Sequence, residues 1–381
     1  MKKIIGVIAE YNPFHLGHRY QIEKIKELYP NSIIIAIIST NFTQRGDISL
    51  LNKWNKTTIC LNEGIDLVIE LPTLYATQSA DIFAYGALSI LNKFKIDTLV
   101  FGSETNDIDY FTTLANIQIN NPKYPELVKN YLSLGLNYPT AMSKALKELT
   151  NTKIDKPNDL LALSYIKEII KNNYPITPIS IKRTNDYHSN SLQNNTNIIN
   201  ASLIREMFLN NQDISPYIPN NTKELLYQYL SLNNAYTILK YNIINNENNL
   251  STYLDIEEGL DKRILKYLDT SHTWIDLVNN LKTKRYTYNK INRTLLHLLL
   301  NIKKEENTKE IYLRVLGFNN KGREYLKKLK KDTNLDIFTS YRKNKSPLLD
   351  LEYHSTYIYS LITNDSSLIK REYQSKPIIL K

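Results

Sequence analysis

Short apolar runs alternate with segments of helical periodicity along the first 183 residues. Continuous apolar runs of this length are typical of parallel strands that are buried on both faces. The predicted strands are Ile4–Ala9, Ser32–Ile38, Asp66–Leu71, Asp97–Gly102 and Thr177–Arg183. Apolar positions at helical spacing predict helices between them, at His18–Leu28, Trp54–Asn62, Ala80–Phe94 and Asn158–Asn172. This alternation predicts an α/β fold with a doubly wound parallel sheet.

The pattern changes near residue 223, where longer helical stretches replace the alternation. We expect helices over Tyr253–Leu268 and Tyr288–Asn301, together with one strand, Ile311–Phe318. The Asn-rich segment Asn190–Asn197 predicts a mobile loop. We therefore predict two domains, residues 1–222 with the sheet and residues 223–381 with a mainly α-helical structure.

Composition excludes several classes of protein. The chain has 381 residues, of which 42% are hydrophobic and 23% charged, as is ordinary for a soluble globular protein. No apolar run approaches the roughly 20 residues of a membrane span, and the first apolar run meets Glu10 too early for a signal peptide. The single cysteine, Cys60, excludes an internal disulfide and a cysteine metal cluster. We expect a cytoplasmic protein with no membrane partner.

The formal net charge of +10 is concentrated in the second half of the chain. Residues 221–381 hold 27 Lys and Arg against 18 Asp and Glu, whereas residues 1–220 hold 21 against 20. Residues 281–345 alone hold 18 basic and 6 acidic residues. This asymmetry favours a catalytic or ligand-binding part joined to a part that binds a polyanion. The alternative is a solvated, lysine-rich surface.

The segment NPFHLGH, Asn12–His18, directly follows the first predicted strand. Ligands bind at the carboxyl ends of parallel strands, and a helix that starts near His18 would present free N–H groups suited to a phosphate there. His15 and His18 would add hydrogen bonds to phosphate oxygens, and Gly17 would allow the ligand to approach the backbone closely. We interpret the segment as a nucleotide site, and the alternative is a loop with two surface histidines.

Residues 4–20 resemble the HxGH nucleotidyltransferase superfamily, and nearly the whole chain resembles the tRNA(Met) cytidine acetate ligase family. The motifs that carry this resemblance occur in the expected order: GVIAEYNPFHLGHRYQ (6–21), NFTQRGD…LNKW (41–54), DLVIELP (66–72), FGSE (101–104), KPNDLLALSY (156–165), IKRTNDYH (181–188), INASLIR (199–205), LLHLLL (295–300) and LRVLGFNNKG (313–322). Two residues depart from the family pattern. Asn52 stands where the family has an aspartate, which leaves any role of a charge there open. Asn200 stands at an expected serine, and both residue types cap helices well.

The resemblance implies a Rossmann-like domain that uses ATP to activate acetate as acetyl-adenylate. It further implies transfer of the acetyl group to N4 of the wobble cytidine of elongator tRNA(Met). His15, His18 and Arg205 are the implied catalytic residues. The expected ATP contacts are Val7, Ile8, Ala9, Glu10, Tyr11, Asn12, Pro13, Phe14, His15, Leu16, Gly17, His18, Arg19, Tyr20, Gly102, Asn158, Arg183 and Ser202. Mg²⁺ is expected only with ATP, since no residue cluster has metal-ligand spacing.

Several of these positions have structural alternatives. Gly102 can serve packing alone, Asn158 can be an ordinary helix N-cap, and Arg205 can be an exposed arginine in a helix capped by Asn200 or Ser202. Lys182 and Arg183 end the fifth predicted strand, and Arg183 is the better candidate for a contact to phosphate or adenine, because a planar guanidinium binds such groups well.

Basic and aromatic residues interleave in the second half, as in Lys282–Arg293, which includes Tyr286 and Tyr288. With the family resemblance, this pattern predicts contacts to tRNA phosphates and to unpaired bases. The expected tRNA-binding residues are Lys282, Lys284, Arg285, Arg293, Lys327, Lys328, Lys330 and Lys331.

Gln44, Arg45 and Lys53 are expected in a loop after the second strand, where they close over substrate, touch RNA or face solvent. Two other functions stay open at this point. One is a nucleotidyltransferase that acts on a small metabolite, and the other is a non-catalytic RNA-binding protein. The sequence predicts no oligomeric state.

Overall fold

The structure is a computed structural model that describes residues 2–183, 198–226, 228, 230–257, 259–307, 310–341, 346–374 and 376–381. The described strands form one sheet. They are β1 (Ile4–Ala9), β2 (Ile33–Ser39), β3 (Leu67–Leu71), β4 (Thr98–Ser103), β5 (Thr177–Lys182), β6 (Leu313–Phe318), β7 (Ile337–Phe338) and β8 (Ile378–Ile379). The loop predicted at Asn190–Asn197 lies outside the described residues.

The strand order places β1 inside the sheet. The order is β5-β4-β1-β2-β3-β6-β7, and β8 also pairs with β6. β1 is parallel to β2 and β4, β2 is parallel to β3, and β4 is parallel to β5. The chain runs from β1 to β3 in one direction and then returns to β4 and β5 on the other side. The predicted doubly wound sheet is confirmed, and β1 and β4 flank its topological switch point.

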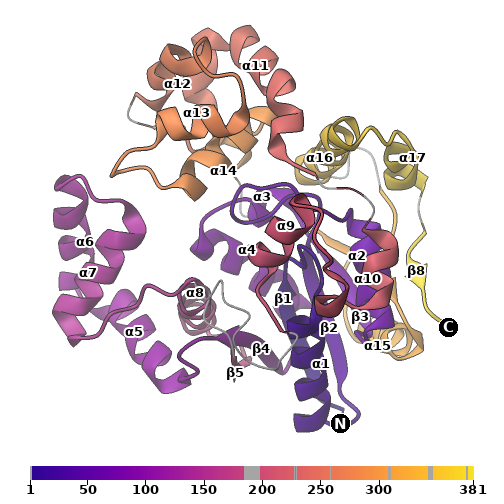
Figure 1. The fold of residues 1–381 in the computed structure, drawn as a ribbon. Helices are drawn as coiled ribbons and strands as arrows, with labels where there is room; N and C mark the ends of the chain where they lie inside the picture. The colour runs from indigo at the N-terminus through magenta and orange to yellow at the C-terminus, as the bar shows by residue number, and fades with distance from the viewer. Residues whose placement is uncertain are drawn as a thin grey trace.

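Helices connect these strands and cover both faces of the sheet (Figure 1). They are α1 (Leu16–Leu28), α2 (Lys53–Asn62), α3 (Thr73–Ala76), α4 (Ala80–Lys93), α5 (Ile108–Asn120), α6 (Lys123–Ser133), α7 (Tyr138–Thr150), α8 (Pro157–Lys171), α9 (Ala201–Leu209), α10 (Asn220–Leu225), α11 (Tyr236–Asn245), α12 (Leu260–Leu268), α13 (Trp274–Leu281), α14 (Tyr288–Leu299), α15 (Asn320–Asp332), α16 (Pro347–Thr363) and α17 (Ser367–Gln374). Short 3₁₀ turns occupy Ser215–Tyr217, Leu232–Ala235, Glu247–Thr252 and Lys304–Glu306. Because parallel crossovers are right-handed, α1 and α2 lie on one face, and α4 and α8 on the other. Among the described residues, no helix has the length and apolar character of a membrane span.

The second half differs from its prediction in two respects. The helix expected over Tyr253–Leu268 was wrong in its first part, since α12 begins at Leu260. The backbone has a positive φ at Asp255 (+68°) and at Gly259 (+79°), which a right-handed helix excludes. The predicted strand does form, but it is β6, and it pairs antiparallel with β3 in the sheet of the first half. The sheet therefore contains strands from both sides of residue 222. The division of the chain into two domains at this residue stays a prediction.

A helical layer made of α11, α12, α13 and α14 lies above the carboxyl ends of the central strands (Figure 1). His297 of α14 is fully buried at the junction, with Nε2 3.1 Å from the carbonyl oxygen of Thr77 just after α3. Its Nδ1 lies 3.4 Å from Oδ2 of Asp255. Burial lowers the pKa of His297 to about 4, although Asp255 opposes this shift. A neutral imidazole therefore links the helical layer to the edge of the sheet.

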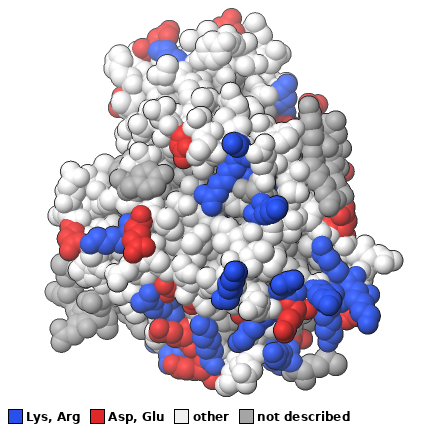
Figure 2. All heavy atoms as spheres, turned by 90° about the vertical axis from the view of Figure 1, so that its right-hand side faces the viewer, with Lys and Arg blue, Asp and Glu red and all other residues white. Residues whose placement is uncertain are grey.

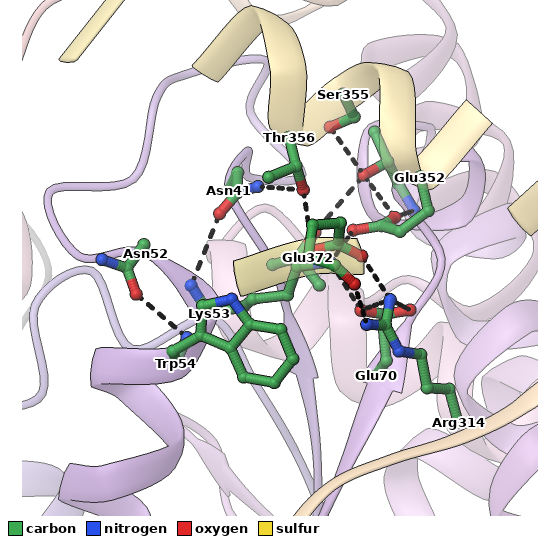
Figure 3. Close-up of polar contacts among 12 residues, drawn as sticks. Asn41, Asn52, Lys53, Trp54, Glu70, Arg314, Glu352, Ser355, Thr356 and Glu372 are labelled. Carbon is green, nitrogen blue, oxygen red and sulfur yellow. Dashed lines mark hydrogen bonds and ion pairs between the residues drawn. The ribbon is translucent and has the colours of Figure 1, made fainter. Parts of the chain in front are cut away.

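A buried ion cluster joins the two halves of the chain (Figure 3). The ammonium of Lys53, at the start of α2, lies 2.7 Å from Glu70 in β3 and 2.9 Å from both Glu352 in α16 and Glu372 in α17. Arg314 of β6 pairs with Glu372 and lies 3.4 Å from Glu70. Each of these side chains is at most 1% exposed. The expectation that Lys53 lies in a loop after the second strand, where it closes over substrate, touches RNA or faces solvent, was therefore wrong.

The charges in this cluster depend on one another. Burial opposes ionisation of Glu372, but Lys53 and Arg314 outweigh it and lower its pKa to about 2. Burial raises the pKa of Glu70 despite the same two cations, and the Tyr312 hydroxyl donates to its Oε1 at 2.6 Å. Removing one cation would therefore leave buried carboxylates without a counter-charge, which is far more costly than losing an exposed ion pair.

We expect Lys53→Met to lower the free energy of unfolding by about 3–5 kcal/mol, since three buried glutamates lose a shared counter-charge and Arg314 remains close to only two of them, Glu70 and Glu372. Urea unfolding followed by circular dichroism measures the change. Lys24→Met is the matched control, because Lys24 pairs with Glu27 at the surface, and its midpoint should stay at the wild-type value. Equal midpoints for the two variants would contradict a stabilising role of the cluster.

Candidate active site

The segment between β1 and α1 lies at the switch point of the sheet. Tyr11–His15 follows the end of β1, and Gly102 lies near the end of the adjacent β4. A ligand over this edge meets the amino terminus of α1 and its unpaired backbone N–H groups. The structure therefore brings the predicted nucleotide-binding segment to the expected edge.

His15 and His18 form a reciprocal cap at the start of α1. Nδ1 of His15 accepts a hydrogen bond from the backbone N–H of Gly17 at 3.0 Å. Nδ1 of His18 in turn accepts from the backbone N–H of His15 at 3.2 Å. The pair thus acts as a capping box made of two imidazoles, which explains their spacing of three residues. The helix starts at Leu16, two residues earlier than predicted, because His15 is its N-cap.

These hydrogen bonds determine the tautomers of both rings. A neutral imidazole that accepts at Nδ1 carries its proton on Nε2. The two ring centroids are 3.7 Å apart, and the ring planes differ by 33°, so the rings stack. His15 and His18 therefore offer two neighbouring Nε2–H donors, while their Nδ1 atoms are used by the backbone.

Burial keeps both rings neutral. His15 is 3% exposed, and burial, with smaller contributions from Arg183 and Arg205, lowers its pKa to about 3. Burial, with contributions from His15 and Arg183, lowers the pKa of His18 well below its ordinary value. The surroundings are thus already positive, because Arg183 disfavours protonation of both rings and Arg205 that of His15, and an anion placed there would offset this positive charge.

Gly17 is required by the packing of the His15 ring. A Cβ at this position would lie 2.8 Å from Cε1 of His15, closer than side-chain carbons approach. The close approach of a ligand to the backbone at Gly17 stays a prediction. The structure shows a second reason for glycine here, because the missing side chain makes room for the His15 ring that caps α1.

Arg205 connects helix α9 to the same segment. Nη1 donates to the carbonyl oxygen of Asn12 at 2.7 Å, and Nη2 donates to Oγ of Ser202 at 3.2 Å. Asn200 caps α9 by accepting from the N–H of Leu203 at 2.8 Å, so its departure from serine preserves the cap. Arg205 is therefore held beside the residues that follow β1.

Gly102 and Arg183 form the side of the site next to β4 and β5. A Cβ at Gly102 would lie 3.4 Å from Cγ of Arg183, an ordinary van der Waals distance, so the Arg183 side chain lies directly beside this glycine. Burial lowers the pKa of Arg183, while Glu104 opposes the shift. The amide of Asn158 donates to Oε1 of Glu104 at 2.6 Å. Asn158 thus already has a structural partner near the place predicted for adenosine.

The turn 43–47, after β2, closes over the end of β1. The N–H of Gln44 donates to Oε1 of Glu10 at 2.5 Å, and its side-chain amide donates to the carbonyl of Gln78 at 2.8 Å. The side chain of Asn12 binds the chain that follows this turn. Its Nδ2 donates to the carbonyl oxygen of Ile48, and its Oδ1 accepts from the N–H of Leu50. This places Arg45 beside Glu10, and burial lowers the Arg45 pKa against the attraction of that carboxylate.

Two predicted residues lie elsewhere. The Arg19 guanidinium forms a two-point ion pair with Glu63 at the end of α2, at 2.6 and 2.8 Å. The Tyr20 ring lies under the ammonium of Lys24, 5.6 Å from its centroid. The Arg19 side chain is therefore paired with the end of α2 and the Tyr20 ring with Lys24 of α1, and their contacts with ATP stay a prediction.

Lys56 is a residue of this region that the sequence argument missed. It is fully buried in α2, and its Nζ donates to the carbonyl oxygens of Ser39 and Thr40 at 2.9 Å each. Burial lowers its pKa to about 7 against the attraction of Glu10. Lys56 thus fixes the chain as it leaves β2. Its spacing of three from Lys53 was the available signal, because such residues share a helix face.

Asn52, the other departure from the family pattern, caps α2. Its Oδ1 accepts from the N–H groups of Trp54 and Asn55 at 3.0 and 2.9 Å. Asparagine therefore satisfies the end of this helix without the negative charge of an aspartate.

The expected tRNA-binding residues fall into two separate groups. Lys282, Lys284 and Arg285 lie in the turn between α13 and α14, and the Arg293 side chain is turned inward beside Asp255, at 4.0 Å. The other group lies on α15 and is exposed: Lys327, Lys328, Lys330 and Lys331. Figure 2 shows Lys and Arg gathered in the lower part of one face, at the level of α15 in Figure 1.

The two histidines should stay in the Nε2–H tautomer from pH 8 down to pH 5, because burial keeps their folded-state pKa values low. Long-range ¹H–¹⁵N NMR measures this, with the exposed His272 as an internal reference. Since His15 takes up its proton only near pH 3 when folded but near 6.5 when unfolded, stability should fall as the pH drops from 6.5 toward 3. A cationic His15 at pH 6 in the free protein would contradict this.

Comparison with known proteins agrees with this geometry. The model of the HIGH Nucleotidyl Transferase family matches residues 1–375. The chain is 39% identical to the tRNA(Met) cytidine acetate ligase of Clostridium perfringens over 99% of this chain and 100% of that protein. It is 36% identical to the Clostridium novyi protein of the same name, over 99% of this chain.

Two solved structures have the same fold. The Thermotoga maritima TmcAL structure bound with alpha-thio ATP superimposes with a TM-score of 0.89 at 29% identity, and the apo form with 0.90 at 28%. Each comparison covers 99% of both chains. The resemblance noted in the sequence is confirmed: this chain belongs to the tRNA(Met) cytidine acetate ligase family of HIGH nucleotidyl transferases.

Proposed function

We propose that this protein is an ATP-dependent ligase that forms acetyl-adenylate and acetylates N4 of the wobble cytidine of elongator tRNA(Met). The observation that carries the proposal is the pair of Nε2–H donors at the start of α1, next to Arg183 and Arg205. The relatives that share 99% of this chain are named for this activity, and one solved relative binds an ATP analogue. Because its substrate is a tRNA, we place the reaction in the cytoplasm.

In the first step, a carboxylate oxygen of acetate attacks the α-phosphorus of ATP, and the bond to pyrophosphate breaks. Both reactants are anionic, so positive and N–H groups that are already in place lower the barrier. His15 and His18 would donate from Nε2 to phosphate oxygens, and Arg205 would neutralise the charge that develops on the leaving pyrophosphate. The fixed backbone hydrogen bonds at Nδ1 keep both rings in the donating tautomer throughout.

In the second step, the N4 amine of cytidine attacks the acetyl carbonyl, the mixed anhydride breaks and AMP leaves. The amine loses one proton, so the products are N4-acetylcytidine and AMP. Adenosine is proposed to lie near the backbone of Gly102, beside the Arg183 side chain. Arg183 would then border the α-phosphate.

Mg²⁺ is proposed as the companion of the ATP phosphates. Among the residues that the structure describes, no group of three or more His, Cys, Asp or Glu side chains is arranged to hold a metal ion. The donors near the histidines are arginines and N–H groups, which suit phosphate rather than a cation. When bound, the ion would neutralise phosphate charge, and the protein would hold it only through the nucleotide.

The other two functions find less support. A nucleotidyltransferase for a small metabolite needs the nucleotide site but gives no role to the helical layer, whereas the family match continues through it. A non-catalytic RNA-binding protein would have no need for the capped, stacked histidine pair. Both alternatives predict that tRNA is not acetylated.

The proposal predicts that pure protein, ATP, labelled acetate and unmodified tRNA(Met) give label in cytidine. Acetyl-coenzyme A without ATP should give none, because the site is built to bind a nucleotide polyphosphate. Nucleoside analysis of the digested tRNA measures both reactions. Acetylation from acetyl-coenzyme A alone would contradict the proposal.

His18→Ala should reduce acetate-dependent exchange of pyrophosphate into ATP by roughly 10²–10³, the usual cost of one preorganised donor. The substitution also removes half of the cap of α1, so thermal unfolding must be measured alongside. His272→Ala, at an exposed position, is the matched control and should retain the wild-type rate. A folded His18→Ala enzyme with normal exchange would exclude a role for this donor.

A further inference from the structure

The turn between α13 and α14 begins a helix that contacts the loop over the nucleotide site. We call Lys282–Arg285 the basic turn. Arg293, further along α14, has its backbone against the turn 43–47, where a Cβ on Gly46 would meet its nitrogen at 2.4 Å. The rise along α14 from Tyr288 to this contact is about 7.5 Å. The basic turn is therefore joined, through the first part of α14, to the loop that covers the end of β1, and it lies on the carboxyl side of the sheet.

Hydrogen bonds hold the basic turn in a defined position. The amide of Asn137, the N-cap of α7, donates to the carbonyl oxygen of Lys284 at 3.3 Å. Oγ1 of Thr283 accepts from the N–H of Tyr286 at 3.1 Å, and Oγ1 of Thr287 caps α14. The turn is thus anchored on both sides and presents its exposed Lys284 and Arg285 side chains outward.

An exposed aromatic ring adjoins these cations. Tyr288 is 51% exposed, and the ammonium of Lys282 lies 5.4 Å from its ring centroid. No acidic residue occurs between Lys282 and Arg293 in the sequence. Cations beside an accessible ring suit single-stranded RNA, whose phosphates need positive charge and whose unpaired bases stack on aromatic faces.

Helix α15 also carries several positive charges, but it lies at the amino ends of the parallel strands. Its Gly322 packs against the carbonyl oxygen of Asp66, just before β3, and its Tyr325 hydroxyl donates to the carbonyl oxygen of Phe94, before β4, at 2.6 Å. The nucleotide site lies at the other end of these strands, about 20 Å away for a strand of six residues. Because α14 meets the carboxyl ends of the strands through His297 and Arg293, an RNA that reaches the site lies on the side of the basic turn and not on the side of Lys327 and Lys328.

We propose that the basic turn and Tyr288 form the docking surface for the single-stranded anticodon loop of the RNA substrate, and that α15 does not contact this loop. The inference rests on the proposed function, because it names the surface through which that substrate reaches the site. It divides the expected tRNA-binding residues into two groups with different roles.

The test compares two double variants that remove the same charge, Lys284→Ser with Arg285→Ser and Lys327→Ser with Lys328→Ser. The probe is a short stem-loop RNA with the anticodon arm of tRNA(Met), and its affinity is titrated against salt. The first variant should bind at least about 10-fold more weakly, and its salt slope should fall by about 0.7–0.9 for each lost phosphate contact. The second variant should bind the stem-loop as the wild type does.

Tyr288→Leu tests the stacking contact with no change in charge. It should weaken stem-loop binding about 5-fold or more and leave the salt slope unchanged. Pyrophosphate exchange with acetate, which needs no RNA, should stay at the wild-type rate in all three variants and shows that they are folded.

The inference is overturned if the α15 variant loses stem-loop affinity as the first variant should, or if the basic-turn variant keeps the wild-type affinity and salt slope. Failure of the proposed function has a different signature. In that case the wild-type protein itself would not exchange pyrophosphate with acetate or acetylate tRNA, whichever surface binds the stem-loop.

Discussion

The ammonium of Lys53 is the charge on which the joining of the two halves of the chain depends. A buried ammonium is tolerated only with counter-charges and hydrogen bonds, and here they come from β3, α16 and α17. The C-terminal helices must therefore pack onto α2 for the first half to be stable. Lys56, one turn further along α2, holds the chain as it leaves β2. The same helix thus links the packing of the C-terminal segment to the edge of the nucleotide site.

The chemistry at that edge depends on how α1 begins. Most helices satisfy their first N–H groups with a hydroxyl or a carboxylate, but here two imidazoles do so through Nδ1. The cap leaves Nε2–H of both rings as the only ring donors, and burial keeps the rings neutral without a ligand. In the proposed reaction, structure and chemistry would use opposite sides of the same rings. Substitution of either histidine would then remove a helix cap together with the proposed phosphate donor.

The helical layer is connected to this edge by two contacts of different character. His297 of α14 joins the end of α3 through a buried neutral ring, and the backbone of Arg293 packs on Gly46 in the turn 43–47. Gln44 in the same turn donates hydrogen bonds to the carboxylate of Glu10 and to the carbonyl oxygen of Gln78. A substrate bound at the helical layer therefore lies next to the loop that covers the nucleotide, which suits an enzyme that passes an acyl group from an adenylate to RNA.

Much of the fold and part of the site could be predicted from the sequence. The buried apolar runs determined the parallel strands, since only a strand covered on both faces is continuously apolar. Their alternation with helices placed NPFHLGH at the carboxyl edge of β1. The family motifs brought His15, His18 and Arg205 to one site, and the structure holds all three around the chain that leaves β1.

Only the tertiary structure decided what these residues contact. The pairing of β6 with β3, the partners of Lys53 and the ion pair of Arg19 with Glu63 all join segments distant in sequence. No local pattern encodes which distant charge a buried lysine meets. The two basic segments have similar composition, yet one leads into α14 on the carboxyl side of the sheet and the other lies at the amino ends of the strands. Composition reports how much charge a segment carries, whereas its position relative to the site depends on how the helices pack against the sheet.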